Sequence, residues 1–189
     1  GKAERIAIVD WDVHHGNGTE HIFYDDANVL TISVHQERNY PLDTGDASIT
    51  GGQAAPFSNL NIPLLPGGGH LTYLYAVQRL ILPKLAAFKP DIVIVACGFD
   101  ASGVDPLSRM LCGSDTFYEM TKALMDFTGK RVVMAHEGGY SEAHVPFCGH
   151  RVLQQLSGSA ITVSDPLSSR ITAQQPDISL NLLQEKRMN

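Results

Sequence analysis

The strongest constraint on the fold of this chain is a repeated alternation between short apolar runs and helical patterns. The apolar runs are bounded by glycine, proline or charged residues and comprise Arg5–Asp10, Val29–Val34, Asp91–Cys97 and Arg131–Ala135. Continuous apolar runs of this length are typical of strands that are covered on both faces, as in parallel sheets. The alternation therefore predicts an α/β fold with a parallel sheet and right-handed crossovers.

Two of the intervening segments predict helices with recognisable boundaries or breaks. Gly16–Tyr24 offers Asn17 as an N-terminal cap, with Glu20 three residues later. Leu71–Ala87 repeats apolar residues at helical spacing, although Pro83 should kink or split the helix.

A third helix is expected over Thr116–Phe127, where Thr116 and Glu119 form a capping box. Its apolar face consists of Phe117, Met120, Leu124 and Phe127. The alternation is interrupted by a long loop over His35–Phe57, and structureless loops of that length are usually functional. We expect one domain over residues 1–158 and a polar tail over residues 159–189, in which residues 178–188 could form one helix.

The composition is that of a soluble folded protein, with 43% hydrophobic and 18% charged residues. No apolar run approaches the roughly 18 residues of a membrane helix, and a net charge of −6 argues against a nucleic-acid-coating surface. The 3 cysteines form no CxxC pair and no signal peptide is apparent, which together favour the cytoplasm. The chain enters its first strand almost at once, as if it began inside a longer domain.

Polar residues follow two of the predicted strands at the edge of the sheet where ligands bind in parallel α/β folds. The first strand leads into Asp10, Asp12 and His14, which share one face if the chain stays extended. Another strand leads into Asp100. Asp12, His14 and Asp100 could bind a metal ion, with zinc the first choice and iron(II) or manganese compatible. The alternative is that these aspartates cap helices or turns and that the histidine is structural.

The sequence indicates the roles of two further residues near these strand ends less specifically. His15 should point away from His14 and is interpreted either as a residue that supports the metal ligands from behind or as a packing residue. Tyr140 follows a pair of glycines after the fourth strand, and its hydroxyl could stabilise an oxyanion that develops at the metal. A glycine-rich turn with a packing tyrosine is the alternative interpretation.

Four segments, DWDVHHGNG from Asp10, TISVH from Thr31, GFDASGVDPL from Gly98 and EGGY from Glu137, occur in an order and spacing that resemble the zinc-dependent histone deacetylase family. The resemblance is closest to class II members and to bacterial histone deacetylase-like amidohydrolases. It covers roughly residues 5–158 and corresponds to the later part of the catalytic domain. It implies a three-layer α/β/α fold of the arginase/deacetylase type, present here as an N-terminally truncated portion.

The resemblance also implies a role for each matched residue. Zinc would be bound by Asp12, His14 and Asp100, with Tyr140 as the catalytic oxyanion donor. A structural monovalent cation, usually potassium, would be bound by Asp10, Asp12, His14, Ser33 and Val34, partly through carbonyl oxygens. Asp10 and Asn17 would orient the catalytic histidines. The substrate tunnel would be lined by Tyr40, Leu107, Gly138 and Gly139.

The family's pair of catalytic histidines lies upstream of the first metal segment, and His14-His15 does not match it. We therefore expect the intact parent to be a zinc-dependent amidohydrolase that removes acetyl groups from acetyl-lysine or acetylpolyamines, and this chain alone to be inactive. One alternative is an arginase-like binuclear manganese hydrolase, for which only Asp105 is to spare as a further ligand. Another is a metal-binding fragment without turnover, which would form a homo-oligomer or associate with the missing N-terminal half.

Overall fold

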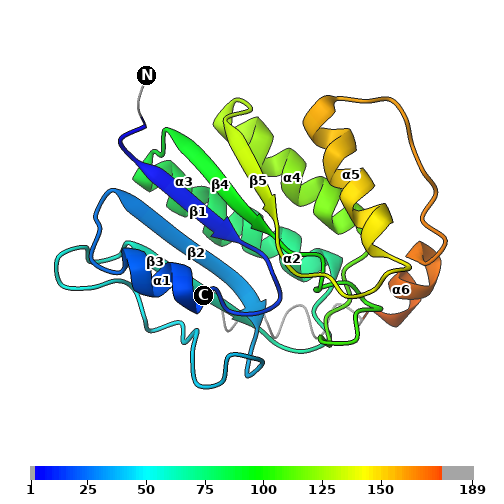
Figure 1. The fold of residues 1–189 in the computed structure, drawn as a ribbon, viewed down its shortest axis with the longest axis horizontal. Coiled ribbons are helices and arrows are strands. Elements are labelled where there is room, and N and C mark those ends of the chain that lie inside the picture. Colours follow the sequence, from blue (N-terminus) through cyan, green and yellow to red (C-terminus); the bar gives the residue numbers. More distant parts are fainter. Residues whose placement is uncertain (1–2, 176–189) are drawn as a thin grey trace.

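Five strands, each parallel to its neighbours, form the sheet at the centre of the computed structural model, which describes residues 3–175. The strands lie in the order β3-β2-β1-β4-β5 (Figure 1). Their bounds are β1 Ile6–Asp10, β2 Val29–Gln36, β3 Asn59–Leu64, β4 Ile92–Cys97 and β5 Val132–His136. The four predicted strands are confirmed, and so is the parallel sheet.

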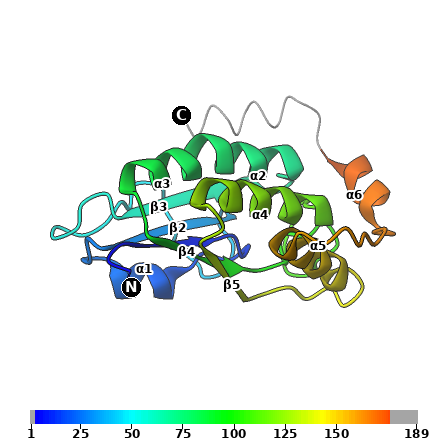
Figure 2. The ribbon, with the colours of Figure 1, turned by 90° about the horizontal axis from the view of Figure 1, so that it is seen from above.

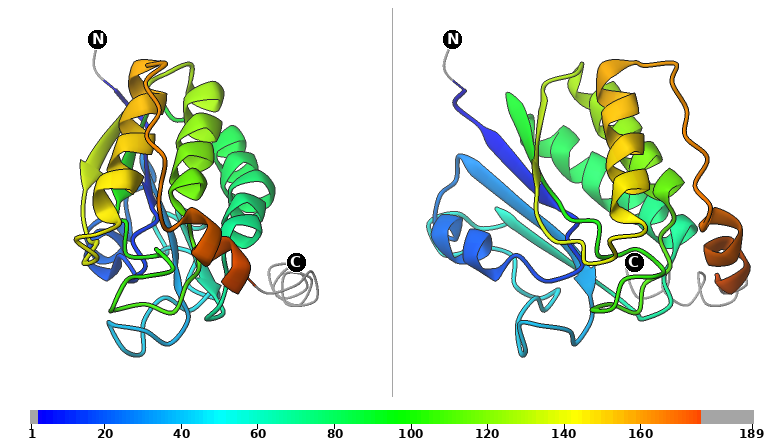
Figure 3. Two further views of the ribbon diagram at one scale, coloured as in Figure 1. Left: turned by 90° about the vertical axis from the view of Figure 1, so that its right-hand side faces the viewer. Right: turned by 45° about the vertical axis from the view of Figure 1, so that its right-hand side comes forward.

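Helices flank the sheet on both sides and complete the α/β/α arrangement that the resemblance implies. The helices α2, α3 and α4 lie along one face, and α1 lies on the other (Figure 2). The helix α5 packs along α4 near the β5 edge (Figure 3). Their bounds are α1 Asn17–Phe23, α2 His70–Ala76, the π-helical turn η1 Val77–Ile81, α3 Leu82–Phe88, α4 Ser114–Thr128, α5 Val145–Ser157 and α6 Ser168–Gln174.

The main hydrophobic core fills the layer between the sheet and α2–α4. Alternate residues of β4, among them Val93 and Val95, point into it and are fully buried. Trp11, Tyr73 and Phe117 are among its largest fully buried side chains. Because these side chains come from the strands and from the opposing helices, the core fixes the helix layer against the sheet.

The other face of the sheet is incompletely covered. Ile8, Ile94 and Val133 are register neighbours on β1, β4 and β5. Ile8 and Ile94 are half-buried, while Val133 is 51% exposed. We call the apolar surface formed by Ile8, Ile94, Ala96 and Val133 the open sheet face. The expectation that every strand is covered on both faces is therefore wrong for β5.

The cap predicted for the first helix is also wrong. Asn17 is the first residue of α1, Gly16 occupies the cap position, and no side chain caps the helix. The Glu20 carboxylate turns instead toward β3 and accepts hydrogen bonds from Asn59 Nδ2 at 2.9 Å and Asn61 Nδ2 at 2.7 Å. Tertiary partners therefore outcompete the local capping interaction.

The capping box predicted at Thr116 is wrong for a similar reason. The helix α4 begins two residues earlier, at Ser114, and Thr116 lies fully buried in its first turn, with its Oγ1 3.1 Å from Nδ1 of His70. The predicted face is buried at Phe117, Met120 and Leu124, whereas Phe127 is 38% exposed.

Pro83 changes the helix geometry without ending the helix. The π-helical turn η1 joins α2 to α3, and Pro83 lies in the first turn of α3. Proline cannot donate to the carbonyl four residues earlier, and the wider π-helical turn accommodates that missing hydrogen bond. The predicted kink or split therefore takes the form of a local widening.

Three elements were not predicted. The strand β3 has the sequence NLNIPL, whose asparagines and Pro63 interrupt the apolar pattern. The helices α5 and α6 lie in the last third of the chain, and α6 falls within the predicted tail. The helix expected over residues 178–188 lies outside the described residues. No helix within residues 3–175 combines the length and apolar character needed to cross a membrane.

A buried histidine should make the stability of this fold depend on pH. Burial, and secondarily the neighbouring His15, lowers the pKa of His35 to about 4. Since an unfolded histidine titrates near 6.5, the unfolded chain binds more protons in between, and stability is lost as pH falls from about 6.5 to about 4. As pH falls through this window, the free energy of unfolding of the parent chain should decrease. In His35→Gln we expect this decrease to be smaller by about 3 kcal/mol.

Urea unfolding between pH 7 and 4 measures this difference. The glutamine side chain can keep a donor toward the Gly45 carbonyl, which His35 Nε2 contacts at 3.1 Å, but it stays neutral. His21→Gln, at an exposed position, is the matched control. Equal pH dependence in both variants would contradict the role of His35.

Candidate metal centre

The carboxyl ends of β1 and β4 bring two separate segments together. These strands pair in register, with Asp10 opposite Ala96, so the residues that follow each strand lie side by side. Asp12 and His14 come from the first segment and Asp100 from the second, and their ligand atoms all lie within 4.8 Å of one another. His14 Nδ1 is 2.9 Å from Asp12 Oδ1 and 3.0 Å from Asp100 Oδ2.

Tight turns, rather than an extended strand, create this convergence. The strand β1 ends at Asp10, and Asp10 Oδ1 accepts the Asp12 N–H at 3.0 Å. In the same way Asp12 Oδ1 accepts the His14 N–H at 2.9 Å. Such bonds from an aspartate to an amide two residues later turn the chain. The expectation that Asp10, Asp12 and His14 share one face of an extended strand is therefore wrong. We call Asp12, His14 and Asp100 the metal-ligand group, and Asp10 lies outside it.

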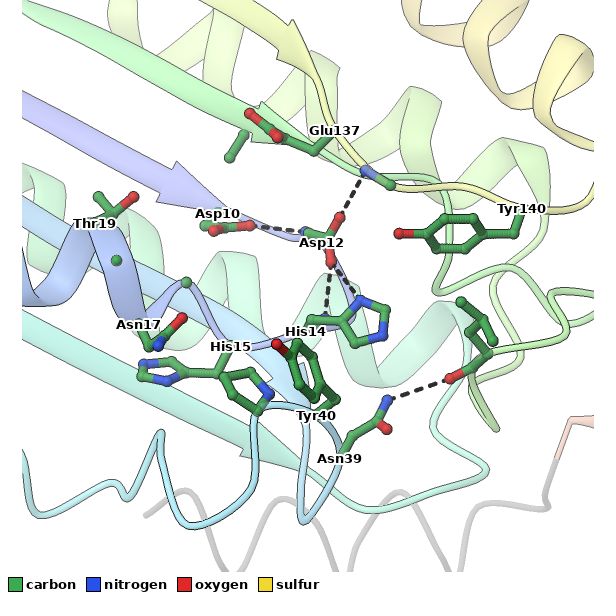
Figure 4. Close-up of a pocket in the computed structure, with 16 residues that line it drawn as sticks. Asp10, Asp12, His14, His15, Asn17, Thr19, Asn39, Tyr40, Glu137 and Tyr140 are labelled. Atoms are coloured by element: carbon green, nitrogen blue, oxygen red, sulfur yellow. Dashed lines mark hydrogen bonds and ion pairs between the residues drawn. The ribbon is translucent and has the colours of Figure 1, made fainter.

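Backbone amides hold the two carboxylates of this group in place. Asp100 is fully buried, and its Oδ1 accepts the Val13 N–H at 2.7 Å. Asp12 Oδ2 accepts the Gly138 N–H at 2.8 Å (Figure 4). One oxygen of each carboxylate is thus oriented by the fold, while its second oxygen faces the His14 ring.

The charge balance of the site fits a metal ion. Two carboxylates directed at one point repel each other, and a positive charge between them relieves this repulsion. Hydrogen bonds with Asp100 and Asp12 raise the pKa of His14 to about 10, although burial opposes the shift. A divalent cation meets the same requirement and is suited to two carboxylate oxygens and one imidazole nitrogen. Its binding would displace the Nδ1 proton of His14.

The loop after β5 passes directly over these carboxylates. A side chain at Gly138 would collide with the carboxylates of Asp100 and Asp12, so only glycine fits there. Gly139 has a φ of +136°, in the region that favours glycine. A side chain at this position would meet Val145 and Phe99, and the role of Gly139 in lining the tunnel stays a prediction. The two glycines bring Tyr140 to the rim of the site.

A cavity of about 800 Å³ opens over the metal-ligand group, and we call it the metal cavity. Tyr40 and Tyr140 stand on either side of His14, with ring centroids 6.3 Å and 6.4 Å from the imidazole and edge-on to it (Figure 4). Of the residues assigned from the sequence, those that line the cavity are Asp10, Asp12, His14, Asn17, Tyr40, Leu107, Gly138 and Tyr140. The rings of Tyr40 and Tyr140 flank the part of the cavity at His14, and we call this part the slot.

Two of the residues assigned to a monovalent cation, Ser33 and Val34, lie on β2 and do not line the cavity, whereas Asp10, Asp12 and His14 do. Asp10 and Ser33 are register neighbours on β1 and β2, and Ser33 Oγ accepts the Gly16 N–H at 3.3 Å. The Val34 side chain is buried in the core, so only its backbone carbonyl could be a ligand. Burial and the charge of Asp12 raise the pKa of Asp10 well above its usual value. A nearby cation would favour ionised Asp10.

Asp105 has a function that the sequence did not reveal. Its carboxylate is 7% exposed, and its Oδ2 accepts the Tyr140 N–H at 2.8 Å while its Oδ1 accepts the Leu107 N–H at 2.9 Å. Both oxygens are therefore occupied by amides. Within residues 3–175 the group of Asp12, His14 and Asp100 is the only cluster of three or more candidate metal ligands, which gives no support to a binuclear site.

His15 and Glu137 complete the surroundings of the site. His15 is buried, its ring lies 4.8 Å from the His35 ring, and its Nε2 lies 3.2 Å from Glu20 Oε2. Its ring is thus held in a polar cluster with Glu20 and His35, although His15 also lines the metal cavity. Glu137 lines the metal cavity beside Ala96 of the open sheet face, although sequence reasoning assigned it no role.

A comparison with protein families identifies the relationship. Residues 1–156 match the model of the histone deacetylase domain. The chain belongs to the histone deacetylase family. A histone deacetylase-like amidohydrolase from Pseudomonas aeruginosa is 49% identical over 189 residues, which cover 98% of this chain and 50% of the relative. The histone deacetylase clr3 from Schizosaccharomyces pombe is 40% identical over 162 residues, which cover 83% of this chain and 24% of the relative.

Solved structures of the family have the same fold. The crystal structure of the HDA15 HD domain matches with a TM-score of 0.81 and 32% identity, over 99% of this chain and 55% of that one. The structure of Clr3 matches with a TM-score of 0.80 and 37% identity, over 92% of this chain and 31% of that one. The chain thus spans about half, or less, of the length of these relatives. The family assignment and the fold type inferred from the motifs are confirmed.

Removal of the Asp105 charge should release the Tyr140 loop. In Asp105→Asn the side chain has one acceptor oxygen, and that oxygen is neutral, so the Tyr140 amide either loses its acceptor or keeps a weaker one than the carboxylate. We expect the Tyr140 amide of this variant to exchange with solvent at least about tenfold faster than in the parent chain.

Hydrogen exchange of ¹⁵N-tyrosine-labelled protein, with the Tyr140 signal assigned from Tyr140→Phe, measures this effect. Asp126→Asn removes the same charge from an exposed position on α4 and is the control. An unchanged exchange rate at Tyr140 in Asp105→Asn would show that the loop does not depend on this carboxylate.

Proposed function

We propose that this chain supplies the metal-binding and oxyanion-stabilising part of a zinc-dependent deacetylase that cleaves the amide of an N-acetylated amine. The observation that carries the proposal is the convergence of Asp12, His14 and Asp100 with Tyr140 around one cavity. Zinc fits the two carboxylates and one imidazole, and it leaves coordination positions open for water and for a carbonyl oxygen. Acetyl-lysine and acetylpolyamines are the two candidate substrates.

The residues of the slot would bind and orient the substrate. Tyr40 and Leu107 would contact the aliphatic part of the acylated amine on entry. The bound metal would polarise the acetyl carbonyl and lower the pKa of a water molecule. Tyr140 points its hydroxyl toward the cavity and would donate a hydrogen bond to the oxygen as negative charge develops on it (Figure 4).

The residues assigned to the monovalent cation would stabilise the site. Asp10, with Ser33 and the backbone carbonyl of Val34, would bind a potassium ion, which would favour the ionised form of Asp10. Asp10 and Asn17 would orient the catalytic histidines of the rest of the domain. Location in the cytoplasm stays a prediction from the sequence.

The remainder of the catalytic domain would pack on the open sheet face. Within the described residues β5 has a strand neighbour on one side only, and Val133 on its exposed surface is 51% accessible. An apolar face beside an unpaired strand edge favours association with another polypeptide. The chain also spans only about half of the Pseudomonas aeruginosa relative. The histidines that transfer protons would come from this remainder of the domain. A second copy of this chain is the alternative partner for the open sheet face.

Zinc binding tests the metal assignment directly. The substitution Asp100→Asn would keep an acceptor for the Val13 N–H but remove a negative ligand, so we expect it to lower zinc affinity by at least about 100-fold. Isothermal titration calorimetry at pH 7.5 measures the affinity, with Asp126→Asn as the control. Equal affinities in parent and Asp100→Asn would exclude Asp100 as a ligand.

Acetate release tests the activity. We expect little release from acetyl-lysine peptides by this chain alone and zinc-dependent release after mixing with the half of the Pseudomonas aeruginosa relative that this chain does not match. Asp100→Asn should abolish that release, and Val133→Glu should weaken the association. Analytical ultracentrifugation separates a mixed complex from a homodimer. Full activity of this chain by itself would contradict the need for the other half.

A further inference from the structure

A second groove begins where the metal cavity ends. It encloses about 650 Å³ between three loops, residues 36–39, 65–66 and 106–109. Asn39 and Leu107 line both this groove and the metal cavity. We call it the mouth groove. A molecule that enters the metal cavity with one end can therefore continue along the mouth groove with the rest.

Hydrogen bonds between the loops make the mouth groove a preformed feature. Gln36 Oε1 accepts the Arg109 N–H at 2.7 Å, and Asn39 Nδ2 donates to the Leu107 carbonyl at 3.4 Å (Figure 4). The Arg109 carbonyl in turn accepts the Gly67 N–H at 2.7 Å. Each loop is thus tied to its neighbour. Binding in a preformed groove loses less entropy than binding to loops that must first order.

The charges on the groove are opposite in sign to the charge of the whole chain. Arg38 and Arg109 line it, and both side chains are exposed. Glu37 is its one acidic lining residue and lies 4.0 Å from Nε of Arg38. The groove therefore has an excess of positive charge on a chain whose net charge is −6. Exposed charges of this kind affect which ligands bind more than they affect stability.

The two candidate substrates present different groups to this groove. An acetyl-lysine in a polypeptide would place its side chain in the metal cavity and leave its backbone at the mouth, so that flanking residues lie along the groove. An acetylpolyamine would instead carry its remaining ammonium groups out past Arg38 and Arg109. Those ammonium groups would be repelled, whereas an acidic side chain next to the acetyl-lysine would be attracted.

We propose that the mouth groove binds the polypeptide that flanks an acetylated lysine and favours an acidic residue beside that lysine. This inference rests on the proposed deacetylase function and narrows its substrate from N-acetylated amines in general to acetylated polypeptides. Arg38 and Arg109 are the residues that determine the preference. Interactions of exposed charges are weak, so the effect is a several-fold preference and not an absolute one.

Equilibrium binding tests the inference without requiring turnover. The probes are fluorescent acetyl-lysine peptides, identical except for flanking glutamates or flanking lysines, with N-acetylspermidine as an unlabelled competitor. Fluorescence anisotropy with the zinc-loaded chain, in the assembly used for the acetate assay and with Tyr140→Phe to suppress hydrolysis of the probes, should give about threefold to tenfold tighter binding of the acidic peptide. The preference should shrink as salt rises from 0.05 to 0.5 M, because exposed charges are screened over roughly 10 Å at 0.1 M.

Two double variants isolate the arginines. Arg38→Ala/Arg109→Ala should remove most of the preference, and the charge reversal Arg109→Glu should move it toward the lysine peptide. Arg79→Ala/Arg170→Ala removes the same charge from exposed positions outside the groove and should leave the preference unchanged. Equal binding of both peptides by the parent chain, or a preference that survives in Arg38→Ala/Arg109→Ala, would overturn the inference.

The outcome for the proposed function can be read separately. Tighter binding of N-acetylspermidine than of the acidic peptide would overturn the groove assignment even if acetate is released. An acidic preference that depends on both arginines, without acetate release from any peptide, would support the groove and contradict the deacetylase function.

Discussion

The geometry of the site depends on two carboxylates held toward one point by backbone amides. Val13 donates to Asp100 and Gly138 donates to Asp12, so three segments distant in sequence fix one pair of charges. Each amide belongs to a segment that itself contributes to the site. The in-register pairing of β1 with β4 brings the first two segments together. Like charges this close repel each other, and a bound cation or the protonation of one carboxyl relieves the repulsion, so the fold favours binding of a cation here.

The same arrangement explains the backbone of the loop after β5. A loop that donates to Asp12 must approach the carboxylates more closely than any side chain allows, which makes Gly138 obligatory. Two successive glycines would leave the next residue free to move, but the Asp105 carboxylate binds the amide of Tyr140. A buried anion thus restores the order that the glycines remove. It also links Tyr140 to Leu107, which lines the same cavity.

Sequence reasoning predicted four of the five strands and the convergence of Asp12, His14 and Asp100, because both depend on local pattern and on the general geometry of parallel sheets. It missed β3 because Asn59 and Asn61, polar residues within the strand, are satisfied by Glu20 from α1, a contact invisible in the sequence. The same contact removed Glu20 from its predicted capping role. The hydrogen bonds of Asp105 were likewise not predicted, since the amides that it binds come from loops whose positions only the fold defines.

The open sheet face and the metal cavity belong to one surface. Ala96 and Glu137 line the cavity, and Ala96 lies beside Ile94 on the uncovered side of β4. A polypeptide that covers this face must therefore also form a wall of the cavity. By excluding water it would strengthen every interaction between the metal, the carboxylates and a developing oxyanion, because these interactions grow as the local dielectric falls. Burial of the apolar face and activation of the metal site would then be a single event, driven by the same hydrophobic association.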